Sequence, residues 1–491
     1  MIKDLTITKF RDGLRRKEFS ALEITRAYLQ EIERRNPELN AYLTVDSEGA
    51  LRQAEEVDAA LARGEELPPL AGVPVAIKDI ILIKGLRATG ASKILEHYTA
   101  SYDAGCVKKL RAQQAVLLGK TNCDEFAMGS SGENSAYGPT KNPRDLTRVP
   151  GGSSSGSAAA VAADMALGSL GTDTGSSVRL PASFCGVVGL RTTYGSVSRS
   201  GVMAMTSSLD QVGPFAKNVE DAALLFRAIA GRDPLDATSN PQEYGEDLVR
   251  PDWEKIKKLT VGLPKEYFID GIEPEVRKVV TEVVETYRRA GIKIKDISLP
   301  HTKDALATYY IIVPAEISAN LARYDGIRYG RTQINADKTQ IGADGQRKSA
   351  LLDLYFQDRA NFGAEPKRRI MLGTFVLSSG YYDAYYAKAQ RVRTLIRRDF
   401  EEAFKQVDAI LTPVSPHLPF KLGEKVNDPL AMYLEDIFMI AVNLAGLPGL
   451  SVPARVPPGH LPVGFQLISP HFREADILGL GRLHEMTTAN Q

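Results

Sequence analysis

Two glycine- and serine-rich runs and one distant lysine are the residues of this chain whose types and spacing could do chemistry. The first run covers residues 151–157 (GGSSSGS), the second covers residues 171–181 (GTDTGSSVRLP), and Lys78 closes the apolar stretch AGVPVAIK. A serine hydroxyl becomes a nucleophile when an adjacent base takes its proton, and a neutral lysine can be that base. The pattern therefore predicts a site that hydrolyses an amide bond and needs neither histidine nor metal.

Other interpretations of the two runs are weaker. Such runs often form only turns, but here both lie in strongly patterned sequence, and the second leads directly into Arg179, Pro181 and an apolar segment. Phosphate binding is a second interpretation, but neither run ends in Gly-Lys-Ser/Thr and no GxGxxG follows a strand. A nucleophile elbow is a third, since residues 152–156 match GxSxG around Ser154. The polar segment 142–150, with two prolines, does not supply the strand that such an elbow requires.

Composition limits the class of protein. The 491 residues carry 61 basic and 60 acidic side chains, a net charge of +1, so any contact with RNA is expected to be local or made by a partner. The N-terminus has no apolar signal region, and the longest apolar stretch, 157–170, is too short to span a bilayer and contains Asp164. Three cysteines without CxxC spacing indicate reduced thiols in a cytoplasmic protein. The six histidines have no metal-ligand spacing, so no metal site is predicted.

The elements that must position these residues alternate between strands and helices. This alternation predicts an α/β fold, a sheet with helices on both faces, in which ligands bind where a strand passes into a helix. Helices are expected in the first 65 residues, with a capping box at Ser20–Glu23. Further helices are expected at about 104–114, 158–166, 273–290 and 381–404. Strands are expected in 73–83, 115–119, 167–170, 258–263 and 409–411.

The lysine and the two runs together resemble the amidase signature family, whose motifs usually read GGSSGGS and DTGGSIR-x-P. The resemblance implies a large mixed sheet covered by helices on both faces and a Ser-Ser-Lys triad. It places the nucleophile at Ser177, the bridging serine at Ser153 and the base at Lys78. It further implies one amidase domain over 1–491, with N-terminal helices in 1–65, a signature core in 71–215 and an insertion loop at 331–350.

The same resemblance assigns the oxyanion loop to Thr174, Gly175 and Ser176, whose backbone N–H groups would stabilise the tetrahedral intermediate. Two family glycines are replaced by serine in this chain, at Ser155 and Ser176. If either position needed a positive φ, serine there would be strained by about 1–3 kcal/mol.

The second half of the chain is similar to the glutaminase subunits of tRNA-dependent amidotransferases, a branch of that family. The segments that carry this similarity are 308–310, 321–330, 367–370, 380–386 and 442–449. The resemblance implies a cytoplasmic heterotrimer in which this chain hydrolyses glutamine and works with two partner proteins, which are designated B and C in that family. It assigns glutamine recognition to Tyr309, Arg369 and Asp436.

The two partners would have different tasks. Ammonia would pass through a tunnel to the first of them, which we call the transferase partner, where ATP, with Mg²⁺, would activate glutamate on mischarged tRNA. The second, which we call the small partner, would hold the other two chains together. The resemblance assigns contact with tRNA mainly to the transferase partner.

Two rival hypotheses remain open from sequence. The chain could be a free-standing amidase that acts on small amides without partners, or a scaffold that keeps the fold and has lost turnover. Dependence of glutamine hydrolysis on a partner separates the first rival from the amidotransferase hypothesis. Labelling of Ser177 by a serine-reactive probe would exclude the second.

Overall fold

The computed structural model describes residues 2–3, 5–326, 329 and 346–489. Its centre is one sheet of eleven strands in the order β1-β3-β2-β4-β6-β5-β10-β11-β9-β7-β8. The strands are β1 (Tyr42–Val45), β2 (Pro74–Lys78), β3 (Val116–Thr121), β4 (Gly168–Asp173), β5 (Val188–Arg191), β6 (Gln211–Ala216), β7 (Thr260–Pro264), β8 (Lys293–Ile297), β9 (Ala409–Pro413), β10 (Gly449–Pro453) and β11 (Gly464–Ile468).

The sheet is mixed, as the sequence predicts. Strand β2 runs parallel to both β3 and β4, and β7 runs parallel to β8 and β9, whereas β5, β6, β10 and β11 pair antiparallel with their neighbours. Because β2, β3 and β4 are parallel, their carboxyl ends lie at the same edge of the sheet. Lys78 and Asp173 are the last residues of β2 and β4, so both lie at this edge.

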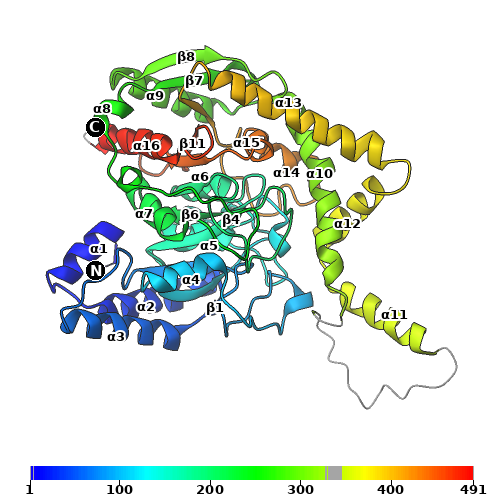
Figure 1. The fold of residues 1–491 in the computed structure, drawn as a ribbon, viewed down its shortest axis with the longest axis horizontal. Coiled ribbons are helices and arrows are strands. Elements are labelled where there is room, and N and C mark those ends of the chain that lie inside the picture. The colour runs from blue at the N-terminus through cyan, green and yellow to red at the C-terminus, as the bar shows by residue number, and fades with distance from the viewer. Residues whose placement is uncertain (1, 4, 327–328, 330–345, 490–491) are drawn as a thin grey trace.

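Helices cover both faces of the sheet (Figure 1). They are α1 (Ile7–Arg15), α2 (Ala21–Leu39), α3 (Ser47–Ala62), α4 (Gly105–Ala112), α5 (Ser155–Ala162), α6 (Arg179–Cys185), α7 (Val219–Ile229), α8 (Trp253–Ile256), α9 (Pro274–Arg289), α10 (Ala305–Asn320), α11 (Gln346–Arg359), α12 (Ala364–Val376), α13 (Lys388–Ala403), α14 (Pro429–Leu434), α15 (Ile440–Ala445) and α16 (Glu474–Ala489). Helices α5 and α6 pack together on the central strands, and α7 packs with α16 on β5, β6 and β10. The short, alanine-rich α5 is almost completely buried, because it lies between the sheet and α6.

Most elements expected from the sequence are present with shifted ends. The capping box of α2 forms as predicted, with the Ser20 hydroxyl accepting from the Glu23 N–H and the Glu23 carboxylate accepting from the Ser20 N–H. The long helix expected from residue 381 begins instead as a π-helical turn, Tyr382–Ala387, before α13. The three cysteines are buried and free, which confirms the prediction that they form no disulfide.

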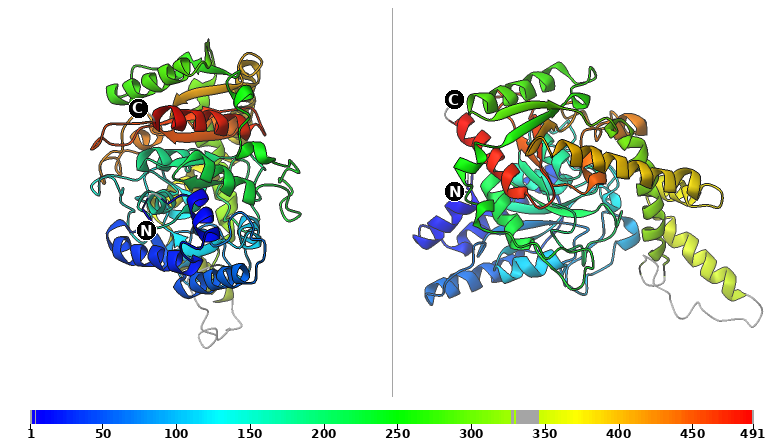
Figure 2. Two further views of the ribbon diagram at one scale, coloured as in Figure 1. Left: turned by 90° about the vertical axis from the view of Figure 1, so that its left-hand side faces the viewer. Right: turned by 45° about the horizontal axis from the view of Figure 1, so that its top comes forward.

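Helices α10, α11 and α12 form one side of the molecule. In Figures 1 and 2, α11 extends away from the body beyond the end of α10. Most of the expected insertion at 331–350 lies outside the described residues, and its last five residues are the beginning of α11. Among the described helices, Thr302–Arg323 is long and apolar enough by composition to cross a membrane, with a mean hydropathy of 1.2. Half of that stretch is buried, because α10 packs on α12, α13 and α15.

Candidate active site

Lys78 is fully buried at the end of β2, where its ammonium group meets three hydroxyls. Its Nζ lies 2.8 Å from the Ser153 Oγ, 2.9 Å from the Ser154 Oγ and 3.0 Å from the Thr172 Oγ1. Burial disfavours the charged form and lowers the pKa of Lys78 to about 8, although nearby acidic groups, among them Asp124 and Asp173, oppose the shift. The predicted base and the predicted bridging serine are therefore in direct contact.

The first serine run is held by close backbone approaches. Gly151 has φ +78°, and a Cβ there would lie 2.9 Å from the Pro181 Cα, so the run lies directly against the second loop. A Cβ on Gly152 would lie 2.1 Å from an oxygen of Asp124. The Gly152–Ser153 peptide bond is cis. Only glycine fits these two positions without displacing the neighbouring loops.

Ser154 has a structural role that its GxSxG context did not predict. Its hydroxyl bonds to Lys78 and donates to the Thr172 carbonyl at 3.1 Å, while the Thr172 N–H lies 3.2 Å from it. No strand enters this turn among the described residues 122–153, which is the context that a nucleophile elbow requires. Ser154 thus ties α5 to β4 and helps to hold Lys78.

The loop between β4 and α6 carries Ser177, the predicted nucleophile, which is 6% exposed. Within the described part of the chain, no acceptor pairs with the backbone N–H groups of residues 174–177. The Gly175 carbonyl, in contrast, accepts from the Arg179 guanidinium at 3.0 Å. Unpaired N–H groups on a fixed loop are what an oxyanion hole requires. No hydrogen bond joins Ser177 to Ser153 among these residues, so that contact of the triad stays a prediction.

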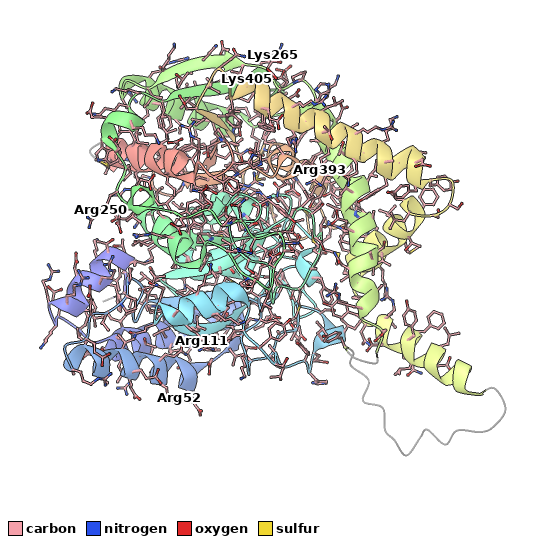
Figure 3. The ribbon with its side chains drawn as sticks, viewed as in Figure 1. Arg52, Arg111, Arg250, Lys265, Arg393 and Lys405 are labelled. Atoms are coloured by element: carbon pink, nitrogen blue, oxygen red, sulfur yellow. The ribbon has the colours of Figure 1, made fainter. Side chains whose placement is uncertain are left out.

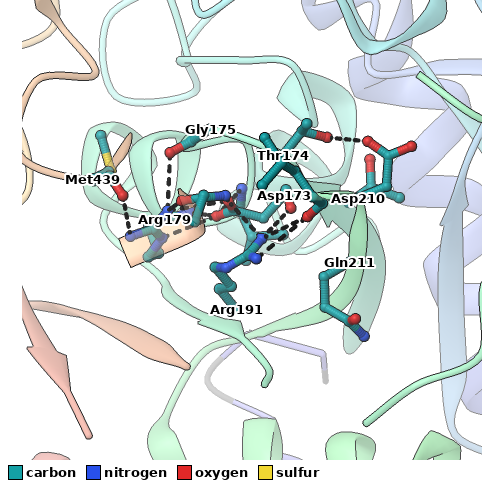
Figure 4. Close-up of polar contacts among 12 residues, drawn as sticks. Asp173, Thr174, Gly175, Arg179, Arg191, Asp210, Gln211 and Met439 are labelled. Carbon is teal, nitrogen blue, oxygen red and sulfur yellow. Dashed lines mark hydrogen bonds and ion pairs between the residues drawn. The ribbon is translucent and has the colours of Figure 1, made fainter. Parts of the chain in front are cut away.

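Asp173 fixes this loop through a buried ionic network (Figure 4). Its carboxylate accepts from Arg179 at 3.0 and 3.1 Å and from Asn443 at 2.7 Å, and it pairs with Arg191 at 3.4 Å. Burial alone would raise the pKa of Asp173, but the two guanidinium groups overcome that and hold it well below its usual range. Thr174 is held on the other side by Asp210, at 2.6 Å from its hydroxyl.

Neither serine that replaces a family glycine lies in the left-handed region. Among the described residues, the non-glycine positions with positive φ do not include Ser155 or Ser176. The strain expected for these substitutions is therefore absent. The Ser176 side chain is buried and its hydroxyl bonds toward the Asp436 carboxylate.

Asp436 is a buried carboxylate with an incomplete set of partners. Its Oδ2 accepts from the Ser130 hydroxyl at 2.7 Å, while Oδ1 has no partner at normal hydrogen-bond geometry among the described residues. Burial raises its pKa to about 6, and the Ser176 and Ser130 hydroxyls and Arg369 oppose the rise. A buried oxygen without a donor can accept from a cationic ligand.

Tyr309 and Arg369 complete the group of predicted substrate residues. Tyr309 of α10 packs on the oxyanion loop, since a Cβ at Gly175 would lie 2.7 Å from its hydroxyl. Arg369 of α12 is buried, and its charge lowers the pKa values of both Tyr309 and Asp436 against the effect of burial. All nine predicted site residues therefore lie on the two loops, on the end of β2 or on elements packed against them.

A clamp around Arg369 was not predicted from the sequence. Glu365, one turn earlier in α12, accepts from the Arg369 Nε at 2.7 Å and from the Tyr433 hydroxyl at 3.1 Å. The guanidinium lies 5.7 Å from the ring centre of Tyr310 and 5.9 Å from that of Tyr433. Its terminal nitrogens have no partner among the described residues, and a pocket lined by Ser130, Arg369 and Tyr433 opens beside them. The i, i+4 spacing of Glu365 and Arg369 was the one available signal.

Comparison with known proteins agrees with this geometry. Residues 23–478 match the Amidase family. The chain therefore belongs to the amidase family of enzymes, which confirms the resemblance and the fold class.

Relatives over the full length carry a more particular name. A protein of Koribacter versatilis (52% identical, 99% of each chain) and one of Geobacter metallireducens (54%, 99% of this chain and 98% of the relative) both bear the name of the glutamyl-tRNA(Gln) amidotransferase subunit that is designated A. A crystal structure of that subunit from Thermotoga maritima is 40% identical, with a TM-score of 0.78 over 98% of this chain and 94% of that one.

Proposed function

We propose that this chain is the glutamine-hydrolysing subunit of a tRNA-dependent amidotransferase that converts Glu-tRNA(Gln) to Gln-tRNA(Gln). The observation that carries the proposal is the buried Lys78 in contact with Ser153, next to a loop whose N–H groups are unpaired and whose serine is slightly exposed. The names of the full-length relatives support the choice of reaction.

In the proposed mechanism, neutral Lys78 takes a proton from Ser153, and Ser153 takes one from Ser177. The Ser177 oxygen attacks the side-chain carbonyl carbon of glutamine, and the N–H groups of the 174–177 loop stabilise the oxyanion. The proton then returns through Ser153 to the leaving nitrogen, which departs as ammonia. Water hydrolyses the acyl-enzyme along the same route and releases glutamate.

Glutamine would be recognised by its α-amino and α-carboxylate groups. The terminal nitrogens of Arg369 suit a carboxylate, since a guanidinium binds one through two parallel hydrogen bonds. The unpaired oxygen of Asp436 suits the ammonium group. Tyr309, packed on Gly175, would close the site over the reacting amide.

The rest of the reaction would belong to the transferase partner and the small partner, designated B and C, in a cytoplasmic heterotrimer. The net charge of +1 and the dispersed cations, six of which are labelled in Figure 3, favour binding of tRNA mainly by the transferase partner. ATP and Mg²⁺ would likewise be used there, with ammonia supplied by this chain.

The first test is ammonia release from glutamine by this chain, alone and with both partners, ATP and Glu-tRNA. We expect release to rise with the partners, and the Ser177→Ala and Lys78→Ala variants each to lose at least ~10³-fold in turnover. Ser169→Ala is the matched control, because that buried hydroxyl donates only to the Ser157 carbonyl. Full activity on simple amides without partners would favour a free-standing amidase, and near-normal turnover by Ser177→Ala would contradict the mechanism.

A further inference from the structure

The outer side of α12 and of the turn after it is the most apolar exposed region of the molecule. Of the nineteen exposed large hydrophobic side chains among the described residues, eleven lie between residues 352 and 395. Six of them form what we call the outer face: Met371, Leu372, Phe375, Tyr381, Tyr382 and Tyr385. Such a concentration in less than a tenth of the chain marks one surface and does not reflect scattered exposure.

The outer face is continuous and preformed. The Phe375 ring lies 4.4 Å from that of Tyr381 and 6.3 Å from that of Tyr385, between ring centres, and the two tyrosines stack at 5.9 Å. Three of its members, Met371, Leu372 and Phe375, follow the i, i+1, i+4 spacing of one helical face. The face is therefore a rigid aromatic surface that has no covering element among the described residues.

The opposite side of α12 belongs to the active site. Glu365 and Arg369 are buried there, and a Cβ at Gly373 would lie 1.8 Å from the Pro314 carbonyl oxygen, so α12 lies directly on α10. Helix α10 in turn carries Tyr309 against the oxyanion loop. One pair of closely packed helices thus connects the outer face to the residues predicted to bind glutamine.

Beyond the outer face, the projecting helix α11 has a second exposed stripe (Figures 1 and 2). Leu352, Tyr355 and Phe356 are 53%, 36% and 60% exposed and have the i, i+3, i+4 spacing of one helical face. At ~200 Å² for a fully exposed large side chain, the eleven residues expose on the order of 1,000 Å². That exceeds the ~300–600 Å² of the largest patch on most monomers and reaches the ~800 Å² that each partner buries in a stable complex.

We infer that the outer face is the surface on which the transferase partner, the one that accepts ammonia, docks. The inference rests on the proposed function, and three observations choose this occupant. The full-length relatives are named as subunits, the exposed area is that of a permanent interface, and the same helices carry the glutamine clamp on their other side. Tyrosine, phenylalanine and methionine are also the side chains enriched at protein interfaces.

The test uses the Met371→Asp variant in the reconstituted complex, because Met371 is 73% exposed. We expect its dissociation constant for the transferase partner, measured by interferometry in the presence of the small partner, to rise at least tenfold. The melting temperature of the isolated chain should not change. The control is Leu235→Asp, an equally conspicuous exposed leucine at 69%, and it should bind as the wild type does. Phe375→Asp is the second variant, and hydrogen exchange across 371–385 should slow in the wild-type complex.

The outcomes separate this inference from the proposed function. If the wild-type chain forms no complex with the two partners, the proposed function fails. If the wild type forms the complex and Met371→Asp and Phe375→Asp form it equally well, the docking surface is wrong while the function stands. Self-association of the wild type that either variant abolishes would assign the face to a second copy of this chain. Binding of the wild type to lipid vesicles, lost in Met371→Asp, would assign it to a membrane and would also overturn the inference.

Discussion

Lys78 is useful as a base because it is buried among hydroxyls and has no carboxylate in contact. Its three partners, Ser153, Ser154 and Thr172, can accept from an ammonium or donate to an amine, so both protonation states keep their hydrogen bonds. A contacting carboxylate would instead stabilise the ammonium and raise the pKa. Burial is what lowers it here, from 10.5 to about 8.

The first prediction follows from that shift. Because only neutral Lys78 can take a proton, kcat/KM for glutamine should rise nearly tenfold per pH unit up to about pH 8 and then level off. The measurement is glutaminase activity of the complex from pH 6 to 9.5. Lys78→Arg should be inactive across the range, since a guanidinium stays protonated. A wild-type profile that is flat between pH 6 and 8 would contradict this assignment of the base.

Ser176 gives a second prediction at the residue scale. Because its φ is not positive, replacing it by glycine relieves no strain and only increases the freedom of the unfolded chain. Ser176→Gly should therefore lower the free energy of unfolding by ~0.5–1 kcal/mol, as measured by urea denaturation. Lys17→Gly is the matched control and should raise it, because the exposed Lys17 has φ +57°. A gain of ~1–3 kcal/mol in Ser176→Gly would show that the loop is strained after all.

At the scale of elements, α12 links recognition to the body of the protein. Glu365 holds the Arg369 Nε and the Tyr433 hydroxyl with one oxygen, which fixes the guanidinium between two rings. Its pKa is lowered, because Arg369 outweighs the effect of burial, so the carboxylate is charged at neutral pH. Glu365 is thus a positioning residue that acts through Arg369.

We predict that Glu365→Gln raises KM for glutamine by ~10-fold with kcat changed less than ~3-fold, since a charged hydrogen bond contributes about 1.5–3 kcal/mol. Steady-state kinetics of the complex measure both constants. Glu401→Gln in α13, which removes an exposed pair with Arg397, should leave KM unchanged. A glutamine analogue without the α-carboxylate should react equally with wild type and Glu365→Gln. An equal loss with that analogue would mean that Glu365 supports the fold and not recognition.

The sequence predicted elements where local pattern decides and failed where tertiary contacts decide. Strands β2, β3, β4, β7 and β9 were expected because each is a short apolar run next to turn residues. The antiparallel β5, β6, β10 and β11 were missed, because glycine and proline within them weaken the pattern. The same limit applies to the site. The motifs located Lys78 and both serine loops, while Glu365, Tyr433 and Thr172 became visible only through contacts between distant segments.

At the scale of the whole molecule, one buried network joins the nucleophile loop to the far half of the sheet. Arg179 bonds to Asp173 and to Gln466 of β11, and Arg191 of β5 bonds to Asp173, while Asn443 of α15 bonds to both Asp173 and Arg179. These residues come from segments up to 287 positions apart. The sheet can therefore position the oxyanion loop only when the C-terminal strands are in place. This dependence favours a single cooperative domain, as the sequence predicts.

The last prediction tests that dependence through Asp173→Asn. The substitution leaves two fully buried guanidinium groups without their counter-charge, and breaking such a pair costs about 3–5 kcal/mol. We expect the free energy of unfolding to fall by that amount in urea denaturation monitored by circular dichroism. Glutamine hydrolysis should fall with it, because Arg179 also holds the Gly175 carbonyl and so directs the loop N–H groups into the site.

Two further variants decide whether the loss comes from the network itself. Glu285→Gln removes the exposed pair with Arg288 and should change stability by less than about 1 kcal/mol. Asn443→Ala removes one neutral partner of Asp173 and should cost about 1–3 kcal/mol, so it stays measurable even if Asp173→Asn does not fold. If Asn443→Ala were as stable and active as the wild type, the loop would be held by local contacts alone, and the C-terminal half of the sheet would have no part in positioning the nucleophile.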